Sequence, residues 1–169
     1  MRTFLLHAAL CISLVAVSLL ASSRAFAQDT STDCSFDDGK QMSIRYNDVD
    51  AKKDSAKRGK AWEPGGKPMA LFTQTNLTLG NSPVPAGAYM LYLIPGSDAW
   101  TLVVNKNVQD PAKYDQKQDI ARVEMPAAEL GSPVDKLKLT LAKMGGTQCN
   151  LRVYYAKTGT YGAEFKEQK

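Results

Sequence analysis

Residues 88–105 decide the fold and read AYMLYLIPGSDAWTLVVN. Two apolar runs, 88–94 and 100–105, flank the turn dipeptide Pro95-Gly96, a pattern typical of a β-hairpin. The first run is apolar on both faces, which indicates a strand in the middle of a sheet with both sides covered. We expect a type II turn at Pro95-Gly96, in which the glycine supplies a positive φ.

Short segments with the same punctuation extend in both directions from this hairpin. Gly and Pro recur between them, and apolar residues alternate with polar ones within them. One or two helical turns are expected, at 110–114 and 126–130. The pattern therefore predicts an all-β fold, an antiparallel β-sandwich, jelly-roll-like or barrel-like, of about nine short strands. The predicted strands are 41–46, 69–75, 77–79, 88–94, 100–105, 120–125, 137–141, 149–156 and 160–165.

The N-terminus has the features of a secretory signal. A short basic start precedes a nearly continuous apolar run over 4–21, and Ala25-Phe26-Ala27 forms a small-x-small cleavage site. An uncleaved membrane anchor is the competing interpretation, because the run is just long enough to span a bilayer. We predict a signal peptide over 1–27, a flexible N-terminal segment over 28–40 and a single β-sandwich domain over 41–169. The protein would be exported to the periplasm or the extracellular space, with no membrane span in its mature part.

Charge and composition exclude several function classes. The chain has 169 residues with 21 basic and 17 acidic side chains, and two of the basic ones lie in the signal. The mature part is therefore close to neutral, which argues against a nucleic-acid partner. The only histidine of the chain, His7, lies in the predicted signal, so the mature part would have none. Histidine-based catalytic schemes and histidine-ligated metal sites are therefore excluded. We expect no catalytic residues, no metal and no cofactor.

Two cysteines, Cys34 and Cys149, remain after cleavage of the signal. An even number in an exported protein favours a disulfide. The alternative is a pair of separate buried thiols. A disulfide would pin the segment before the first predicted strand to a strand near the C-terminus.

The motifs around the hairpin resemble a known family. Pro85-Ala86-Gly87-x-Tyr89-x-Leu91, Ile94-Pro95-Gly96, Trp100-Thr101-Leu102 and Asn105-Lys106 are similar to the core of the exported bacterial family called domain of unknown function 2911. Tyr114-Asp115, the segment 119–125 with Arg122-Val123, and Ser132-Pro133-Val134 extend the likeness over roughly residues 42–165. The resemblance implies a small β-sandwich and export, with no established activity.

One segment departs from the family pattern. The family follows the tryptophan that corresponds to Trp62 with Arg and soon with a Gly-Ala-Asn-Glu run, whereas this chain has Glu63-Pro64-Gly65-Gly66-Lys67-Pro68. A site formed by that run in other members would be lost or changed here.

Aromatic residues supply the candidate binding site. Trp62, Tyr92, Trp100, Tyr154 and Tyr155 could include a platform for stacking sugars, although aromatics in a small sandwich also serve as core. The binding residues that we predict are Trp62, Tyr92, Trp100 and Asn105.

Three polar clusters have weaker functional interpretations. The oxygens of Asn47, Asp48, Asp50 and Asp54 could hold calcium, but lysines interrupt the run and a solvated loop is favoured. The basic run between residues 52 and 60 could contact an anionic sugar or headgroup, or simply be solvated. Scattered carboxylates could form a glycosidase pair, which requires two facing carboxyl groups; they are Asp37, Asp38, Asp115, Glu124 and Glu129.

The sequence therefore predicts an exported, non-catalytic binding or envelope-associated module whose partner is a carbohydrate or another envelope component. The alternative is a carboxylate-based hydrolase that acts on envelope or polysaccharide material. An enzyme would need a pocket with two ionisable groups, whereas a binder can use an open aromatic surface.

Overall fold

The computed structural model describes residues 30–110, 113–129, 131–156 and 159–168. The predicted signal peptide over 1–27 lies outside these ranges, and so does part of the helical turn predicted at 110–114. In the described ranges, no helix is long and apolar enough to cross a membrane.

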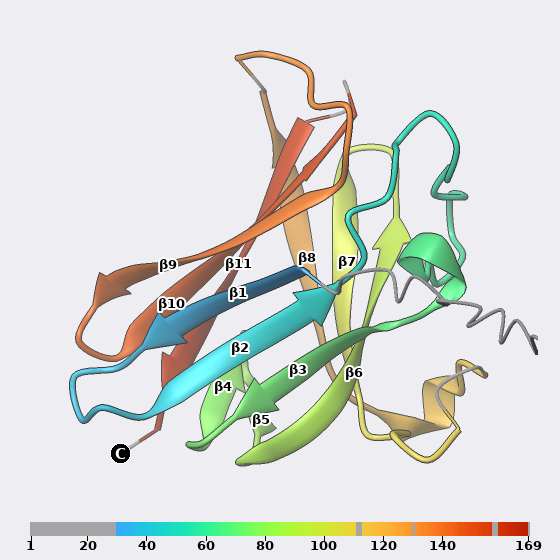
Figure 1. Cartoon of the computed structure of the whole chain (residues 1–169). Coiled ribbons are helices and arrows are strands. Elements are labelled where there is room, and N and C mark those ends of the chain that lie inside the picture. The colour runs from blue at the N-terminus through green and yellow to red at the C-terminus, as the bar shows by residue number, and fades with distance from the viewer. Residues whose placement is uncertain (1–29, 111–112, 130, 157–158, 169) are drawn as a thin grey trace, which may run out of the picture.

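Antiparallel strands and two short 3-10 turns make up the described fold, which confirms the predicted all-β class (Figure 1). The two turns are η1 (Pro64–Gly66) and η2 (Gln116–Gln118). The strands are β1 (Thr30–Ser35), β2 (Gln41–Tyr46), β3 (Met69–Thr73), β4 (Leu77–Leu79), β5 (Ser82–Val84), β6 (Gly87–Pro95), β7 (Ala99–Asn105), β8 (Asp119–Ala128), β9 (Lys138–Gly145), β10 (Gln148–Tyr155) and β11 (Gly159–Glu167).

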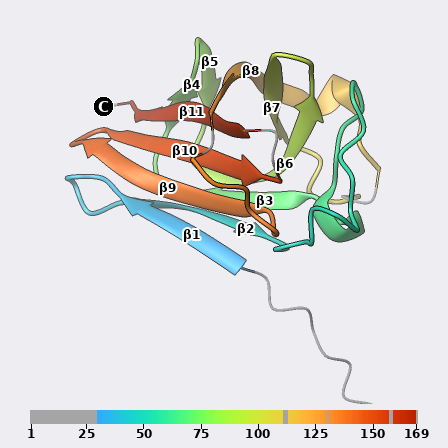
Figure 2. The same cartoon turned by 90° about the horizontal axis from the view of Figure 1, so that it is seen from above.

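The strands form one nearly closed, barrel-like sheet in the order β1-β2-β3-β6-β7-β8-β11-β10-β9, with the β4–β5 hairpin attached to β11. The two ends of this path meet, because β1 lies beside β9 (Figure 2). There the backbone N–H of Leu141 donates to the hydroxyl of Thr32 at 2.8 Å, and the N–H of Leu139 donates to the Tyr46 hydroxyl at 3.1 Å. Side chains therefore replace a backbone ladder at this seam.

The core lies between the two layers that Figure 2 shows from above. Alternation places one side of each strand inside, as in β2, where Met42, Ile44 and Tyr46 are buried between exposed or half-buried neighbours. The hairpin of β6 and β7 forms as predicted, with Leu91 opposite Val104 and Leu93 opposite Leu102 in the core.

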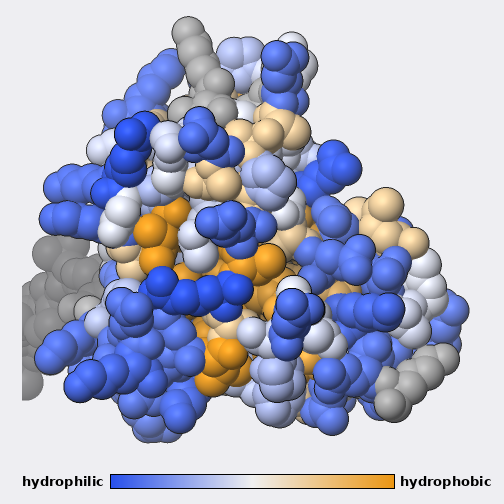
Figure 3. All heavy atoms as spheres, turned by 180° about the vertical axis from the view of Figure 1, so that it is seen from behind, coloured by the Kyte–Doolittle hydropathy of each residue, from blue (hydrophilic) through white to orange (hydrophobic). Residues whose placement is uncertain are grey.

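Seen from behind, the molecule presents mainly hydrophilic residues, with apolar residues visible between them (Figure 3).

The prediction of a flexible segment over 28–40 differs from the structure, because residues 30–35 form β1. This strand pairs with β2 along its whole length, from Thr30 opposite Tyr46 to Ser35 opposite Gln41. Its polar composition gives no local signal for a strand, since only Cys34 of its six residues is buried. Backbone pairing with β2 supplies the order that composition does not.

Two local predictions made from the sequence, a helical turn at 126–130 and a type II turn at Pro95-Gly96, are also wrong. No helical turn occurs over the described part of 126–130, because β8 continues to Ala128, where it pairs with Thr160 of β11. Gly96 does not have a positive φ, so the turn is not type II. A glycine is needed there for a steric reason: a Cβ would lie 2.2 Å from the carbonyl oxygen of Ala99.

The predicted disulfide between Cys34 and Cys149 is present, with the two Cα atoms 6.2 Å apart. Both cysteines are buried, and they join β1 to β10 across the seam beside β9. The bond links two points 115 residues apart in sequence. It therefore fastens the N-terminal strand to the C-terminal half of the sheet.

Candidate functional site

The two tryptophans that we predicted to bind a ligand lie in the core. Trp62 and Trp100 meet edge to face at 6.0 Å, and Trp100 stacks on Tyr161 at 4.4 Å between ring centroids. Tyr155 contacts both indoles. Because Trp62 and Trp100 are 6% and 4% exposed, neither ring offers a stacking face to solvent.

Tyr92 and Asn105 lie on the opposite side of the sheet from the tryptophans. Tyr92 is fully buried there, and the ring of Tyr114, from the segment after β7, packs against it at 4.7 Å. Burial, with a smaller contribution from the negative charge of Glu63, raises the pKa of Tyr92 to about 12. The amide of Asn105 donates to the carbonyl oxygen of Asp115 and to a carboxylate oxygen of Asp119. Asn105 therefore fastens this segment to the sheet.

An ionic network also holds the segment after β7 against the sheet near Tyr92 and Asn105. Arg122 donates to Asp119 at 2.8 Å and also contacts the hydroxyl of Tyr114, which itself donates to Asp119 at 2.8 Å. Burial raises the pKa of Tyr114, and hydrogen bonding to Asp119 raises the pKa of Arg122. The structure thus brings Tyr92 near Asn105 and places both apart from Trp62 and Trp100, so the four residues do not line one cleft.

A hollowed surface lies instead along the outer face of β2 and β3. Three neighbouring hollows follow one another there, with volumes of about 550, 250 and 260 Å³. We call them the first, middle and third hollow. The first and middle hollows share Asn47 and Lys67 as walls, and the middle and third share Phe72. They therefore form one continuous strip.

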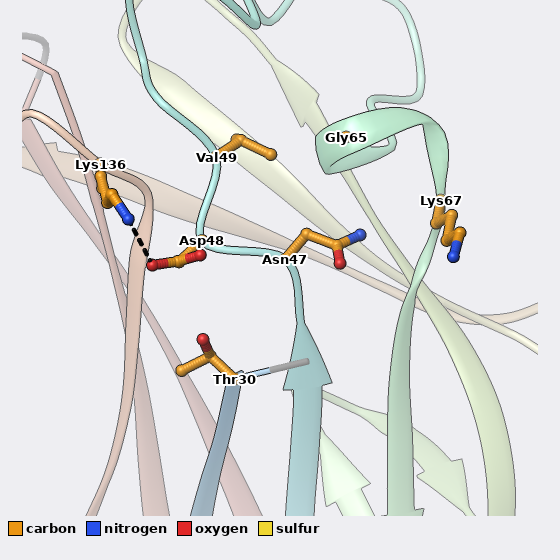
Figure 4. Close-up of a pocket in the computed structure, with 7 residues that line it drawn as sticks. All are labelled: Thr30, Asn47, Asp48, Val49, Gly65, Lys67 and Lys136. Carbon is orange, nitrogen blue, oxygen red and sulfur yellow. Dashed lines mark hydrogen bonds and ion pairs between the residues drawn. The ribbon is translucent and has the colours of Figure 1, made fainter. Parts of the chain in front are cut away.

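The first hollow lies where β2 ends (Figure 4). Asp48 is paired with Lys136 at 2.9 Å on one side of Asn47, and Lys67 lies on the other side. The amide of Asn47 donates to the carbonyl oxygen of Pro64 at 3.0 Å, which ties the wall of the hollow to η1. Gly65 has a φ of +70°, and a Cβ there would come within 3.2 Å of Val49. Glycine thus keeps this side of the hollow open.

The first hollow is connected to the tryptophan cluster through Asp54. One carboxylate oxygen of Asp54 accepts from the indole N–H of Trp62 at 3.1 Å, and the other accepts from the backbone N–H of Gly65. A ligand that shifts Gly65 would therefore change the surroundings of Trp62. Tryptophan fluorescence should therefore be sensitive to a ligand in the first hollow.

The middle and third hollows flank an exposed aromatic ring. Phe72 is 40% exposed, which makes it one of the two large apolar side chains that stand out of the described surface, with Met144 of β9. The guanidinium of Arg45 lies over the Phe72 ring at 5.3 Å from its centroid. The third hollow also has polar walls from Asp33, Ser43 and Gln74. Ligand sites in general combine apolar or aromatic side chains with a few hydrogen-bonding groups, and this surface has that composition.

Phe72 is the site residue that sequence reasoning missed. Its signal was present, because Met69, Leu71 and Thr73 alternate with Ala70 and Phe72 along the strand. The first three are buried, so the aromatic ring must point out of the sheet. An aromatic out of phase with the core positions of its own strand was therefore the informative observation.

The polar clusters weighed from the sequence have structural roles. Asp50 and Asp54 accept hydrogen bonds from nearby backbone N–H groups, namely those of Lys52 and Gly65. In the ranges the structure describes, no group of three or more acidic or cysteine side chains is arranged to hold a metal ion. The basic side chains Lys57, Arg58 and Lys60 are exposed.

Comparison with known proteins identifies the family of this chain. No curated protein and no solved structure matches the chain. Residues 28–161, which include ten of the strands completely and the beginning of β11, match the family described as Protein of unknown function (DUF2911). The chain therefore belongs to the DUF2911 family of proteins of unknown function.

Proposed function

We propose that this protein is an exported, non-catalytic binding module that takes a saccharide chain of the cell envelope along the three-hollow strip. The observation that carries this proposal is the continuity of the strip around an exposed aromatic ring. Asn47 and Lys67 join the first hollow to the middle one, and Phe72 joins the middle one to the third.

The shape of the strip favours a chain-like ligand over a compact one. A compact small molecule is bound in a single enclosed pocket, whereas here one pocket-sized volume is followed by two smaller ones along the strands. The apolar face of one sugar unit can pack against the part of the Phe72 ring that Arg45 leaves open, while its neighbours occupy the hollows on either side. Polar walls then meet the hydroxyl groups of the chain.

The strip lacks a pair of facing carboxylates, which a glycosidase needs within about 5–9 Å. Its two acidic wall residues lie in different hollows, Asp48 in the first and Asp33 in the third. Asp48 is moreover engaged by Lys136. This arrangement supports binding without turnover.

Two features support export. The predicted signal peptide over 1–27 directs the chain to the secretory pathway, and the Cys34–Cys149 disulfide suits an oxidising compartment. N-terminal sequencing of the mature protein should begin at Gln28. A mature protein that retains the apolar run would contradict this part of the proposal.

Binding can be tested by titrating the mature protein with oligosaccharides prepared from bacterial envelope material. The intrinsic fluorescence of Trp62 should report occupancy through Asp54 and Gly65. Phe72→Ala should weaken binding about tenfold or more, because stacking on an aromatic ring contributes on the order of 1–3 kcal/mol. Met144→Ala, which removes the other exposed apolar side chain from β9, is the matched control and should bind as the wild type does. Equal affinity of wild type and Phe72→Ala would refute the proposed site.

A further inference from the structure

We infer that the saccharide is acidic, and that Arg45 and Lys67 form a subsite in the middle hollow for the carboxylate of a uronic acid unit. This inference rests on the proposed function and deepens it. It concerns the class of saccharide and does not decide whether one is bound.

The two cations line the same hollow. Arg45 projects outward from β2, and Lys67 follows η1 and precedes β3. The walls of this hollow contain no acidic residue; they are Arg45, Tyr46, Asn47, Lys67, Pro68, Ala70 and Phe72. Two positive charges therefore face one space of about 250 Å³ without a carboxylate to neutralise them.

The other charges of the strip do not cancel this pair. Asp48 in the first hollow is balanced by Lys136 at 2.9 Å. Asp33 lines the third hollow and is the diagonal cross-strand neighbour of Arg45, since Asp33 lies opposite Ser43 and Ser31 lies opposite Arg45. Among the described residues, neither Arg45 nor Lys67 has an ion-pair partner within 4.0 Å. The middle hollow therefore holds two cations that no described carboxylate pairs with.

The geometry of Arg45 suits a planar carboxylate. Its guanidinium is held over the Phe72 ring at 5.3 Å by a cation–π contact, which leaves its edge free to donate two parallel hydrogen bonds. Lys67 adds a point charge from the wall that the middle hollow shares with the first. A sugar unit placed against Phe72 would direct an exocyclic carboxylate to this edge.

The neighbouring hollows distinguish a sugar acid from a simple anion. A free phosphate or sulfate would fill the middle hollow and leave the first and third unoccupied. A polyuronate places a carboxylate in the middle and further sugar units on both sides, using Asn47 and the polar walls of the third hollow. The continuity of the strip thus favours the polymer.

Calorimetric titration with oligogalacturonate and with a neutral malto-oligosaccharide of matched length tests this inference. We expect the acidic chain to bind at least tenfold more tightly at low salt, and the difference to shrink as salt rises. Arg45→Gln and Lys67→Gln should each reduce oligogalacturonate affinity about tenfold, because each removes a charge-assisted hydrogen bond to the carboxylate. Their weak binding of the neutral chain should not change.

Matched controls lie elsewhere on the surface. Arg152→Gln on β10 and Lys138→Gln on β9 remove the same charges from exposed positions and should leave affinity unchanged. Circular dichroism and thermal midpoints would confirm that all four variants fold.

The outcomes separate this inference from the proposed function. Equal binding of acidic and neutral chains, abolished by Phe72→Ala and insensitive to Arg45→Gln and Lys67→Gln, would overturn the acidic subsite and leave the binding module intact. Inorganic phosphate that competes as strongly as the oligouronate would show a simple anion site and would also overturn it. Failure of every saccharide to bind would remove both proposals.

Discussion

Removal of the Cys34–Cys149 disulfide should cost a large fraction of the stability of this domain. The bond joins residues separated by 115 positions, so it closes most of the mature chain into a loop. In the chain-entropy model, a loop of this length stabilises the folded state by about 5 kcal/mol, chiefly by restricting the unfolded chain. A domain of this size has a total free energy of unfolding of about 5–15 kcal/mol.

The position of the bond adds a local effect. At the seam, no strand ladder joins β1 to β9; the hydroxyls of Thr32 on β1 and Tyr46 on β2 accept from backbone N–H groups of β9. Without the disulfide, β1 keeps its pairing with β2 on one side and this single hydrogen bond from Leu141 to Thr32 on the other. We therefore expect β1 to exchange its amide hydrogens faster than β3, which is paired on both sides.

The assay is urea unfolding of the Cys34→Ala/Cys149→Ala variant beside the oxidised and the reduced wild type. The variant and the reduced wild type should both lose roughly 4–5 kcal/mol, and reductant should have no effect on the variant. Hydrogen exchange would locate the local loosening at β1. A loss below about 1 kcal/mol, or exchange in β1 unchanged from the oxidised protein, would refute the reasoning.

Three further predictions concern single residues. Because burial, with help from Glu63, raises the pKa of Tyr92 to about 12, the unfolded chain loses the phenol proton from pH 10 while the folded chain keeps it. Stability should therefore fall by up to about 2–3 kcal/mol between pH 10 and 12, and this fall should be smaller in Tyr92→Phe when unfolding is followed by urea titration at each pH. Glu167→Met should raise the free energy of unfolding by about 1 kcal/mol, since both carboxylate oxygens of Glu167 are buried and make no hydrogen bond of good geometry to the described residues, although Asp38 and Lys40 lie near; an unchanged or lower urea midpoint would contradict this. Gly96→Ala should destabilise the protein by about 1–3 kcal/mol, because the new Cβ would lie 2.2 Å from the backbone oxygen of Ala99, and a thermal midpoint equal to that of wild type would show that the turn relaxes freely.

Strand positions and fold class could be predicted from the sequence because they depend on local patterns. Alternation along 41–46 and the two apolar runs around Pro95-Gly96 predicted β2 and the β6–β7 hairpin to within one residue at each end. The pairing of Cys34 with Cys149 was predicted from the even number of cysteines that remain outside the predicted signal peptide. These inferences needed no knowledge of which elements meet in space.

β1 and the end of β8 depended on distant partners. The polar residues 30–35 become a strand only because β2 offers its edge, and residues 126–128 remain extended because β7 and β11 pair with them. Backbone hydrogen bonds between segments far apart in sequence leave no signature in the composition of either segment. Local propensity therefore predicted a frayed tail and a helical turn.

The exposure of aromatic rings was likewise decided by tertiary structure. Alternation assigns side chains to two faces of a strand, but it does not say which face is covered or by what. Trp62 and Trp100 are buried because both face the space between the two layers, and Tyr92, on the other face, is buried because Tyr114 and its segment cover it. On that same outer surface Phe72 stays 40% exposed, and among the described residues the guanidinium of Arg45 lies over its ring. Local patterns in the sequence were enough to predict most of the strands, their alternation and the disulfide. The way the sheet closes on itself and the route of the segment after β7 set which rings stay exposed, because burial is a property of all the elements that surround a side chain.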